Sequence, residues 1–281
     1  IIMRAILVLS LTMIFFGSEL FAGGHSSTLQ DVKARGKLRC VVTTGLPGFA
    51  APDANGVWRG FDWDFCRATA AAVLGDANAV DPITSTGKTR FTKLNAGEGD
   101  VLWRNTTITF SRDVSVKLRF LGVNYYDGQG FMVNKSLGVS SAKELDGASV
   151  CIQTGTTTEL NLADFFSSNN MSYEAVTIET NDEARQNYEA GRCDIYTTDA
   201  SGLASTRSSL PNPNDHMVLP EIISKEPLGP AVRQGDDAWA DIITWVLNAT
   251  ITAEELGVNS SNVDQMRNSN NPEIRRMLGT D

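Results

Sequence analysis

Apolar residues recur along the chain in two patterns, short runs and helical spacing. Runs at 37–43 and 149–153 predict strands, whereas the segment 62–74 has apolar residues on one helical face and Gly75 after its end. The other predicted helices are 29–35, 89–96, 157–167, 182–190, 200–207 and 236–247, and the other predicted strands are 100–103, 131–134, 173–178, 194–197 and 217–223. This alternation favours an α/β fold with mostly parallel sheets flanked by helices.

One pattern occurs twice in the sequence. AGEGDVLW at 96–103 and AGRCDIYT at 190–197 share a helix-ending Ala-Gly, an Asp three residues after the Gly, and an apolar strand start. Five residues past the shared Asp, the copies have Asn105 and Asp199. We interpret the repeat as two similar lobes; the alternative is a common helix-to-strand turn used twice. Because ligands of open α/β sheets bind beyond the carboxyl ends of strands, two facing ends would form a cleft.

The chain is expected to cross between the lobes twice. The helix at 236–247 follows the last strand of the second lobe and is therefore assigned to the first. The crossings then fall near 125–128 and 222–229, and two crossings make a hinge. We expect lobe one to comprise residues 27–125 and 224–281, and lobe two residues 126–223.

Composition and charge narrow the class of protein. The 281 residues, 42% hydrophobic and 20% charged, suffice for two globular domains. The net charge of −9 and the lack of a Lys/Arg tract disfavour nucleic-acid binding.

The first residues have the layout of a secretory signal peptide. Arg4 precedes an apolar stretch at 5–16 and small residues at 17–24, and we expect cleavage near Ala22, so that residues 1–22 form the leader. The apolar stretch is shorter than the roughly 20 residues that span a bilayer. We expect an exported protein without direct membrane insertion, the alternative being a retained signal anchor.

The cysteines indicate an oxidising compartment. There are four of them, Cys40, Cys66, Cys151 and Cys193. An even number in an exported chain favours disulfides, and three pairings are open. If each lobe closes its own bridge, Cys40 pairs with Cys66 and Cys151 with Cys193. Zinc is disfavoured because no Cys-x-x-Cys spacing occurs and the chain has only two histidines, so we expect no metal and no cofactor.

Two segments offer groups that recognise a carboxylate. In GTTTEL at 155–160, Thr156 and Glu159 match a capping box, which predicts a helix whose first-turn N–H groups, starting at Thr157, form an anion site. In NTTITFSRD at 105–113, Arg112 presents a planar guanidinium that can bind a carboxylate through two hydrogen bonds. The alternatives are an ordinary helix cap and a surface ion pair of Arg112.

Asp199 is the candidate for the opposite charge. It follows a predicted strand and precedes a short helix, where it could also be an N-cap. A buried carboxylate requires a cation, so with Arg112 across the cleft the fitting ligand is a zwitterionic amino acid. Phe49 and Trp103 could supply apolar walls or belong to the core, and for Trp103 the core is favoured.

The sequence resembles the periplasmic amino-acid-binding proteins of bacterial ABC importers, and most closely their broad-specificity L-amino-acid-binding branch. The stretches that carry the resemblance are TTGLPGFAAPD, GFDWDFCRA, RNTTITFSRD, NYYDGQGFMV, ELDGASVCIQTGTTTELNLADFF, AGRCDIYTTDASGLAS and LPEIISKEPLGPAVRQGDDAW. The resemblance implies a two-lobed type II periplasmic binding fold with a two-strand hinge, a periplasmic monomer, an L-amino acid as ligand and a membrane permease as partner.

The resemblance also implies roles for particular residues. The ligand α-carboxylate would meet Arg112, Thr107 and the helix start at Thr156 and Thr157, and the α-amino group would meet Asp199. Asn105 is a further candidate because it occupies the position in the first repeat that Asp199 occupies in the second.

Some positions depart from the family. Trp63 and Trp103 replace smaller side chains, which leaves the pocket size and the preferred amino acid open, and Gly99 replaces an apolar residue. The family continues past the point that matches Asp281, so we expect a truncated chain.

Two other functions remain open at this stage. A sensory module would use the same clamshell, and sequence does not separate it from an importer component. An exported enzyme on this scaffold is disfavoured because the chain has no GxSxG, HExxH or dinucleotide glycine motif. We therefore expect a binding protein rather than an enzyme.

Overall fold

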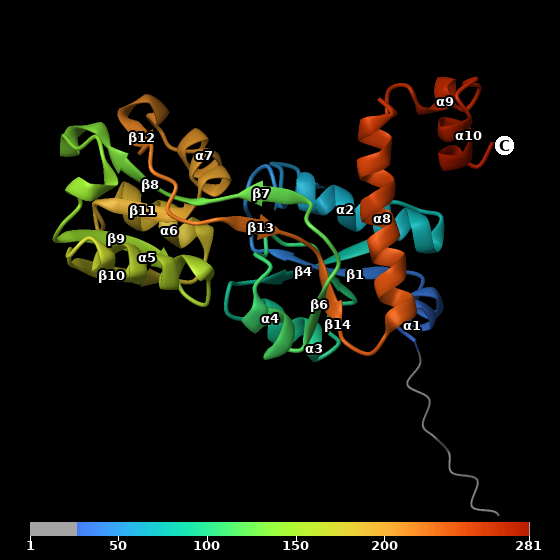
Figure 1. Ribbon diagram of the computed structural model, residues 1–281, viewed down its shortest axis with the longest axis horizontal. Coiled ribbons are helices and arrows are strands. Elements are labelled where there is room, and N and C mark those ends of the chain that lie inside the picture. The colour runs from blue at the N-terminus through green and yellow to red at the C-terminus, as the bar shows by residue number, and fades with distance from the viewer. Residues whose placement is uncertain (1–26, 281) are drawn as a thin grey trace, which may run out of the picture.

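The computed structural model describes residues 27–280, and the predicted signal peptide lies outside them. Two five-stranded sheets lie side by side, each with helices packed against it (Figure 1). The first sheet has the order β4-β1-β5-β14-β6 and consists of β1 (Leu38–Thr43), β4 (Val80–Ser85), β5 (Val101–Leu102), β6 (Leu118–Phe120) and β14 (Ala231–Arg233). The second has the order β10-β9-β11-β8-β12 and consists of β8 (Gln129–Asn134), β9 (Ala148–Gln153), β10 (Tyr173–Ile178), β11 (Ile195–Asp199) and β12 (His216–Val218). We call the parts built around these sheets lobe one and lobe two.

Each sheet combines parallel and antiparallel pairs. In lobe one, β1 runs parallel to β4 and β5, and β14 runs antiparallel to β5 and β6. In lobe two, β9 runs parallel to β10 and β11, and β8 runs antiparallel to β11 and β12. The sheets are mixed as expected, but only half of the strand pairs in each sheet are parallel, whereas mostly parallel sheets were predicted. The reason is that β8 and β14 enter their sheets directly from the crossings, without the helical connection that parallel neighbours need.

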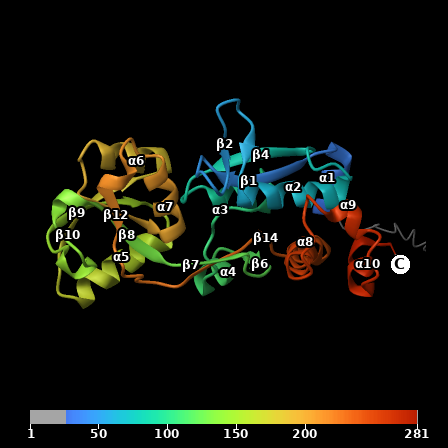
Figure 2. The ribbon, with the colours of Figure 1, turned by 90° about the horizontal axis from the view of Figure 1, so that it is seen from above.

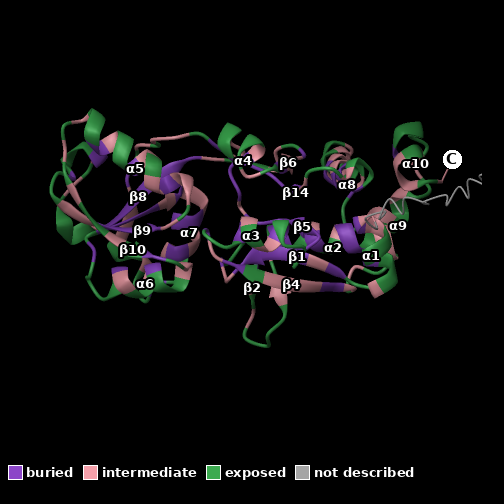
Figure 3. Ribbon diagram, turned by 90° about the horizontal axis from the view of Figure 1, so that it is seen from below, coloured by how far each residue is buried: buried purple, intermediate pink, exposed green. Residues whose placement is uncertain are grey.

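The helices cover the sheets and leave the strands buried (Figure 3). Lobe one has α1 (Thr28–Arg35), α2 (Phe61–Leu74), α3 (Arg90–Asn95), α4 (Phe110–Val114) and α8 (Asp237–Glu255), and lobe two has α5 (Thr157–Ser168), α6 (Asn181–Glu189) and α7 (Ala200–Ser208). Helix α8 packs into the core of lobe one through Trp239, Ile243 and Leu247. Viewed from above, α9 (Val263–Met266) and α10 (Pro272–Leu278) lie at the end of the molecule away from lobe two (Figure 2).

Two extended segments connect the lobes. Strand β7 (Tyr125–Asp127) leads into lobe two, β13 (Glu226–Leu228) returns to lobe one, and the two pair antiparallel (Figure 1). These segments coincide with the crossings predicted near 125–128 and 222–229, and they form the two-strand hinge. A small hairpin of β2 (Ala51–Pro52) and β3 (Trp58–Arg59) follows β1.

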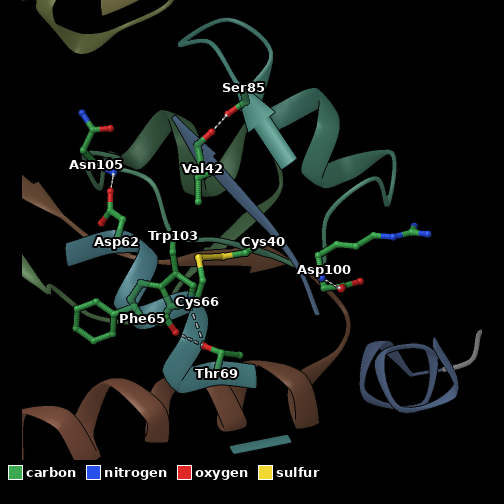
Figure 4. Close-up of a disulfide and its surroundings, with 11 residues drawn as sticks. Cys40, Val42, Asp62, Phe65, Cys66, Thr69, Ser85, Asp100, Trp103 and Asn105 are labelled. Atoms are coloured by element: carbon green, nitrogen blue, oxygen red, sulfur yellow. Dashed lines mark hydrogen bonds between the residues drawn. A yellow bond between two sulfur atoms is a disulfide. The ribbon is translucent and has the colours of Figure 1, made fainter. Parts of the chain in front are cut away.

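Each lobe contains one disulfide. Cys40–Cys66 joins β1 to α2 in lobe one (Figure 4), and Cys151–Cys193 lies in lobe two. These are the pairs expected if each lobe closes its own bridge.

Trp103 lies next to the first disulfide and belongs to the core. It is 1% exposed, stacks on Phe65 with ring centroids 4.4 Å apart, and donates from Nε1 to Thr69 Oγ1 at 3.1 Å (Figure 4). Trp63 is also buried, against Trp58. The core interpretation of Trp103 is therefore correct.

Candidate functional site

A small cavity lies where strand ends of the two lobes face each other. Its lining combines the segment after β5 with the end of β9, the start of α5 and the end of β11. The lining residues are Arg90, Arg104, Asn105, Thr107, Gln153, Thr156, Thr157, Thr158, Thr198 and Asp199. The volume is about 20 Å³, so the lobes must separate about the hinge to admit an amino acid. A larger hollow of about 1010 Å³ lies beside α1 and Asp100, at the amino ends of the lobe-one strands, where α/β sheets do not usually bind ligands.

Five predicted site residues line this cavity, and two do not. Asn105, Thr107, Thr156, Thr157 and Asp199 belong to the lining. Arg112 lies behind it. The Arg112 guanidinium is buried, donates from Nη1 to the carbonyl oxygen of Thr107 at 2.8 Å, and lies 5.3 Å from the ring centre of Phe91.

Phe49, predicted as an apolar wall or a core residue, lies outside the small cavity. Its ring packs edge-on against Phe61 and Tyr125, and it lines a separate pocket of about 370 Å³ between the lobes. The serines of α7, among them Ser201 and Ser205, form the other wall. Phe49 therefore does not form a wall of the small cavity.

The start of α5 differs from the predicted capping box. Thr156 Oγ1 donates back to the carbonyl oxygen of Gln153 at 2.7 Å, and Glu159 accepts from the Gly155 N–H at 3.0 Å. No side chain caps the helix, because the Thr156 hydroxyl is turned away from the first turn. The first-turn N–H groups therefore have no side-chain acceptor at the cap, and they lie beside the cavity where a helix start favours negative charge.

Asp199 is a buried carboxyl with an unusual pKa. It occupies the N-cap position of α7, but its side chain does not cap the helix. Burial, assisted by the carboxylates of Asp127 and Glu226, raises the pKa of Asp199 to about 8, although Arg90 and Arg112 act in the opposite direction. Among residues 27–280, no arginine or lysine nitrogen comes within 4.0 Å of the Asp199 carboxylate. The Asp199 carboxyl therefore has no direct ion-pair partner in this part of the chain, although Arg90 and Arg112 act on it at longer range.

Two buried arginines in the lining were not predicted. Arg90 and Arg104 are 2% and 4% exposed. Arg90 donates to Thr106 Oγ1 at 3.2 Å and, across the cleft, to the carbonyl oxygen of Gly155 at 3.5 Å, while its Nε is buried without a hydrogen-bond partner. Burial lowers the pKa of Arg90, and it lowers the pKa of Arg104 to about 10. The sequence held a clue to Arg90, because this residue lies at the start of the predicted helix 89–96. The clue was not used because the strand before that helix, β4, was not predicted.

Asn105 is held by its backbone and leaves its side-chain oxygen without a partner. The Asp62 carboxylate accepts the Asn105 N–H at 2.8 Å (Figure 4), and burial raises the pKa of Asp62 to about 6. The Asn105 Oδ1 is buried and has no hydrogen-bond partner. Among the side-chain atoms of the cavity lining, Asn105 Oδ1 and Arg90 Nε are therefore buried without a hydrogen-bond partner.

Neither a metal site nor a membrane span is found in the described chain. Within residues 27–280, no group of three or more His, Cys, Asp or Glu side chains is placed to hold a metal ion. No helix in this part is long and apolar enough to cross a membrane.

Comparisons with known proteins point to one family. Residues 38–259 match the bacterial extracellular solute-binding proteins, family 3. The glutamate/glutamine/aspartate/asparagine-binding protein BztA of Rhodobacter capsulatus is 62% identical over 271 residues, covering 94% of this chain and 80% of that protein. The general L-amino acid-binding periplasmic protein AapJ of Rhizobium johnstonii is 57% identical over 269 residues, covering 94% and 79%.

Solved structures agree with this likeness. A periplasmic binding protein of an ABC transporter from Brucella ovis, with glutathione bound, superposes with a TM-score of 0.88 at 55% identity over 92% of this chain and 81% of that one. An ancestral amino acid-binding protein described as a precursor of cyclohexadienyl dehydratase superposes with a TM-score of 0.70 at 27% identity over 85% and 99%.

Proposed function

The chain belongs to the bacterial extracellular solute-binding proteins, family 3, and from this we infer that it captures an L-amino acid between its lobes and delivers it to the permease of an ABC importer. Relatives at 57% and 62% identity carry names that describe amino-acid binding. The protein would act in the periplasm after cleavage of the predicted leader. The two sheets support a division into lobe one, 27–125 and 224–281, and lobe two, 126–223.

The ligand α-carboxylate would bind between Arg112 and the start of α5. The helix start offers N–H groups without a side-chain cap, and its dipole favours an anion. Arg112 lies behind Thr107 and would reach the carboxylate once the lobes have parted and closed again around the ligand. Its planar guanidinium suits a carboxylate geometrically.

The α-ammonium group would bind Asp199. The observation that carries this proposal is the buried carboxyl of that residue. Asp199 is buried, no arginine or lysine of the described residues forms an ion pair with it within 4.0 Å, and its pKa is raised to about 8. A ligand ammonium supplies a direct ion-pair partner, and the unpartnered Asn105 Oδ1 offers it a second acceptor. A zwitterion therefore satisfies groups that the protein alone leaves unsatisfied.

The arginines indicate which amino acids bind best. Arg90 has a buried Nε without a partner, and Arg104 lines the same cavity. Side chains that end in carboxylate or amide oxygens complement these donors, whereas Lys and Arg side chains would bring a second positive charge next to them. We therefore propose Glu, Asp, Gln and Asn as preferred ligands, in agreement with the name of the Rhodobacter relative.

A screen of the common L-amino acids by thermal shift, followed by calorimetry, tests the proposal. A ligand at 100 times its Kd stabilises the folded state by about 2.7 kcal/mol. The acidic and amide amino acids should give the largest shifts and Lys and Arg the smallest, and each ligand should be recovered chemically unchanged. If no amino acid binds at millimolar concentration, the proposal is wrong. Uptake of labelled ligand that does not depend on this protein would favour a sensory role instead.

A further inference from the structure

The hinge strand β13 carries a buried carboxylate that hydrogen-bonds to both lobes. Glu226 is 2% exposed, and its backbone pairs with Asp127 of β7. Its carboxylate accepts hydrogen bonds from the side chains of Thr107, Thr157, Asn161 and Ser224.

Two of these bonds lie on the side of the hinge and lobe one. Thr107 Oγ1 donates to Glu226 Oε2 at 2.5 Å, and Ser224 Oγ donates to Oε1 at 2.6 Å. Thr107 also forms a β-bridge with Leu228 of the same strand. Thr107 is therefore fixed beside Glu226 by the backbone, independently of the position of lobe two.

The other two bonds cross the cleft to α5. Thr157 Oγ1 donates to Glu226 Oε2 at 2.9 Å, and Asn161 Nδ2 donates to Oε1 at 2.7 Å. Both donors lie near the start of the helix, where the helix dipole also favours a negative charge. A rotation about the hinge that moves α5 away from β13 breaks both bonds, so they exist only when the lobes are closed.

These bonds also restrict what the two threonines can do. A Thr hydroxyl has one proton to donate, and Thr107 and Thr157 give theirs to Glu226. A ligand carboxylate only accepts hydrogen bonds, so these hydroxyls cannot donate to it while they hold Glu226. The carboxylate is then left to Arg112 and the backbone N–H groups of α5.

We propose that Glu226 is a positioning residue that holds the cleft closed over the bound ligand by accepting hydrogen bonds from Thr157 and Asn161. The inference rests on the proposed function, because it concerns how long an amino acid stays in the site. Because these bonds are absent while the lobes are apart, we expect Glu226 to slow the dissociation of the ligand and to leave its association rate unchanged.

Asn161→Ala is the primary test of this proposal. Asn161 does not line the cavity, and its replacement removes one bond across the cleft while the charge of Glu226 remains. The loss of a hydrogen bond to a charged group typically changes an equilibrium constant by about tenfold or more. We expect the dissociation rate of L-glutamate, measured by stopped flow, to rise about tenfold, with an unchanged association rate.

A double-mutant cycle with Glu226→Ala shows whether the effect passes through Glu226. If it does, Asn161→Ala has no further effect on dissociation in the Glu226→Ala background. The proposal is overturned if the dissociation rate of Asn161→Ala equals that of the wild type, or if Asn161→Ala has the same effect in both backgrounds.

Glu221→Gln is the matched control. Glu221 also accepts two hydrogen bonds, from Ser141 Oγ and the Ala142 N–H, but both partners lie in lobe two. The Glu221→Gln variant should bind and release L-glutamate at the same rates as the wild type. A purely structural role of Glu226 would instead lower the melting temperature and the fraction of binding-competent protein without changing the dissociation rate. If the wild type binds none of the amino acids, the proposed function fails and this inference falls with it; if the wild type binds and the cycle is additive, only the inference fails.

Discussion

At the scale of single residues, Asp199 connects ligand chemistry to pH. Burial and two neighbouring carboxylates raise its pKa from 3.8 to about 8 in the closed cleft. When the lobes separate, water reaches the carboxyl and its pKa returns toward the ordinary value. Closing the cleft without a cation therefore takes up a proton at neutral pH, whereas closing it around an ammonium group does not.

This difference predicts that the affinity for one ligand depends on pH and the affinity for another does not. Glutarate has the two carboxylates of L-glutamate but no ammonium, so it should bind weakly and more tightly as the pH falls from about 8 to 6, by up to about tenfold per unit. L-glutamate should bind with nearly constant affinity over the same range. Calorimetry in buffers of different ionisation enthalpy would count the protons taken up. Equal affinities and equal proton uptake for both ligands would show that Asp199 does not meet the ammonium group.

The sequence predicted some residues that line the cavity, and others became visible only in the structure, for a physical reason. Asn105 and Asp199 were predicted because they follow strands at equal positions of a repeat, and both line the cavity. Arg90 and Glu226 were missed because their importance depends on contacts between lobes, Arg90 with Gly155 and Glu226 with Thr157. A sequence pattern within one segment does not predict contacts with a distant segment.

At the scale of elements, apolar periodicity located most long helices and central strands. Strand β10 (Tyr173–Ile178) has the predicted bounds. The missed strand β4 contains Pro82 and lies at the edge of its sheet, where proline is tolerated and the apolar pattern is weak. The short strands β6, β13 and β14 were also missed, because three residues do not establish a period.

The return crossing depends on a glycine after β13. A Cβ at Gly229 would lie 2.0 Å from the carbonyl oxygen of Gly122 and 3.1 Å from Ile108 Cδ1. We expect Gly229→Ala to lower the free energy of unfolding by about 1–3 kcal/mol, because backbone must shift to relieve the overlap. Urea denaturation measures the loss.

Gly130→Ala provides the comparison for this variant. Gly130 is a buried strand residue at which a Cβ would come no closer than 3.4 Å to its neighbours. Gly130→Ala should therefore lower the free energy of unfolding clearly less than Gly229→Ala does. Equal losses for the two variants would refute the claim that close approach at Gly229 is what requires glycine.

At the scale of the whole molecule, each lobe has its own covalent cross-link. The bridges span 26 residues in lobe one and 42 in lobe two. Replacing Cys151 and Cys193 together by Ala should lower the stability of lobe two by roughly 2–4 kcal/mol, because the unfolded segment regains conformational freedom.

The same double variant should retain ligand affinity. Neither cysteine lines the small cavity. The denaturation midpoint should therefore fall, while the affinity measured by calorimetry should stay the same. A loss of affinity as large as that of an Asp199 variant would mean that the bridge shapes the site directly.

The central claim is that one zwitterion is held by charges from both lobes, and the calorimetric titration of L-glutamate into the wild type, Arg112→Ala and Asp199→Ala tests it most directly. Removing one partner of a buried charge pair costs about 3–5 kcal/mol, which corresponds to roughly two to four decades in Kd. The account predicts losses of this size in both variants, with folding intact. Affinity equal to that of the wild type in either folded variant would contradict it.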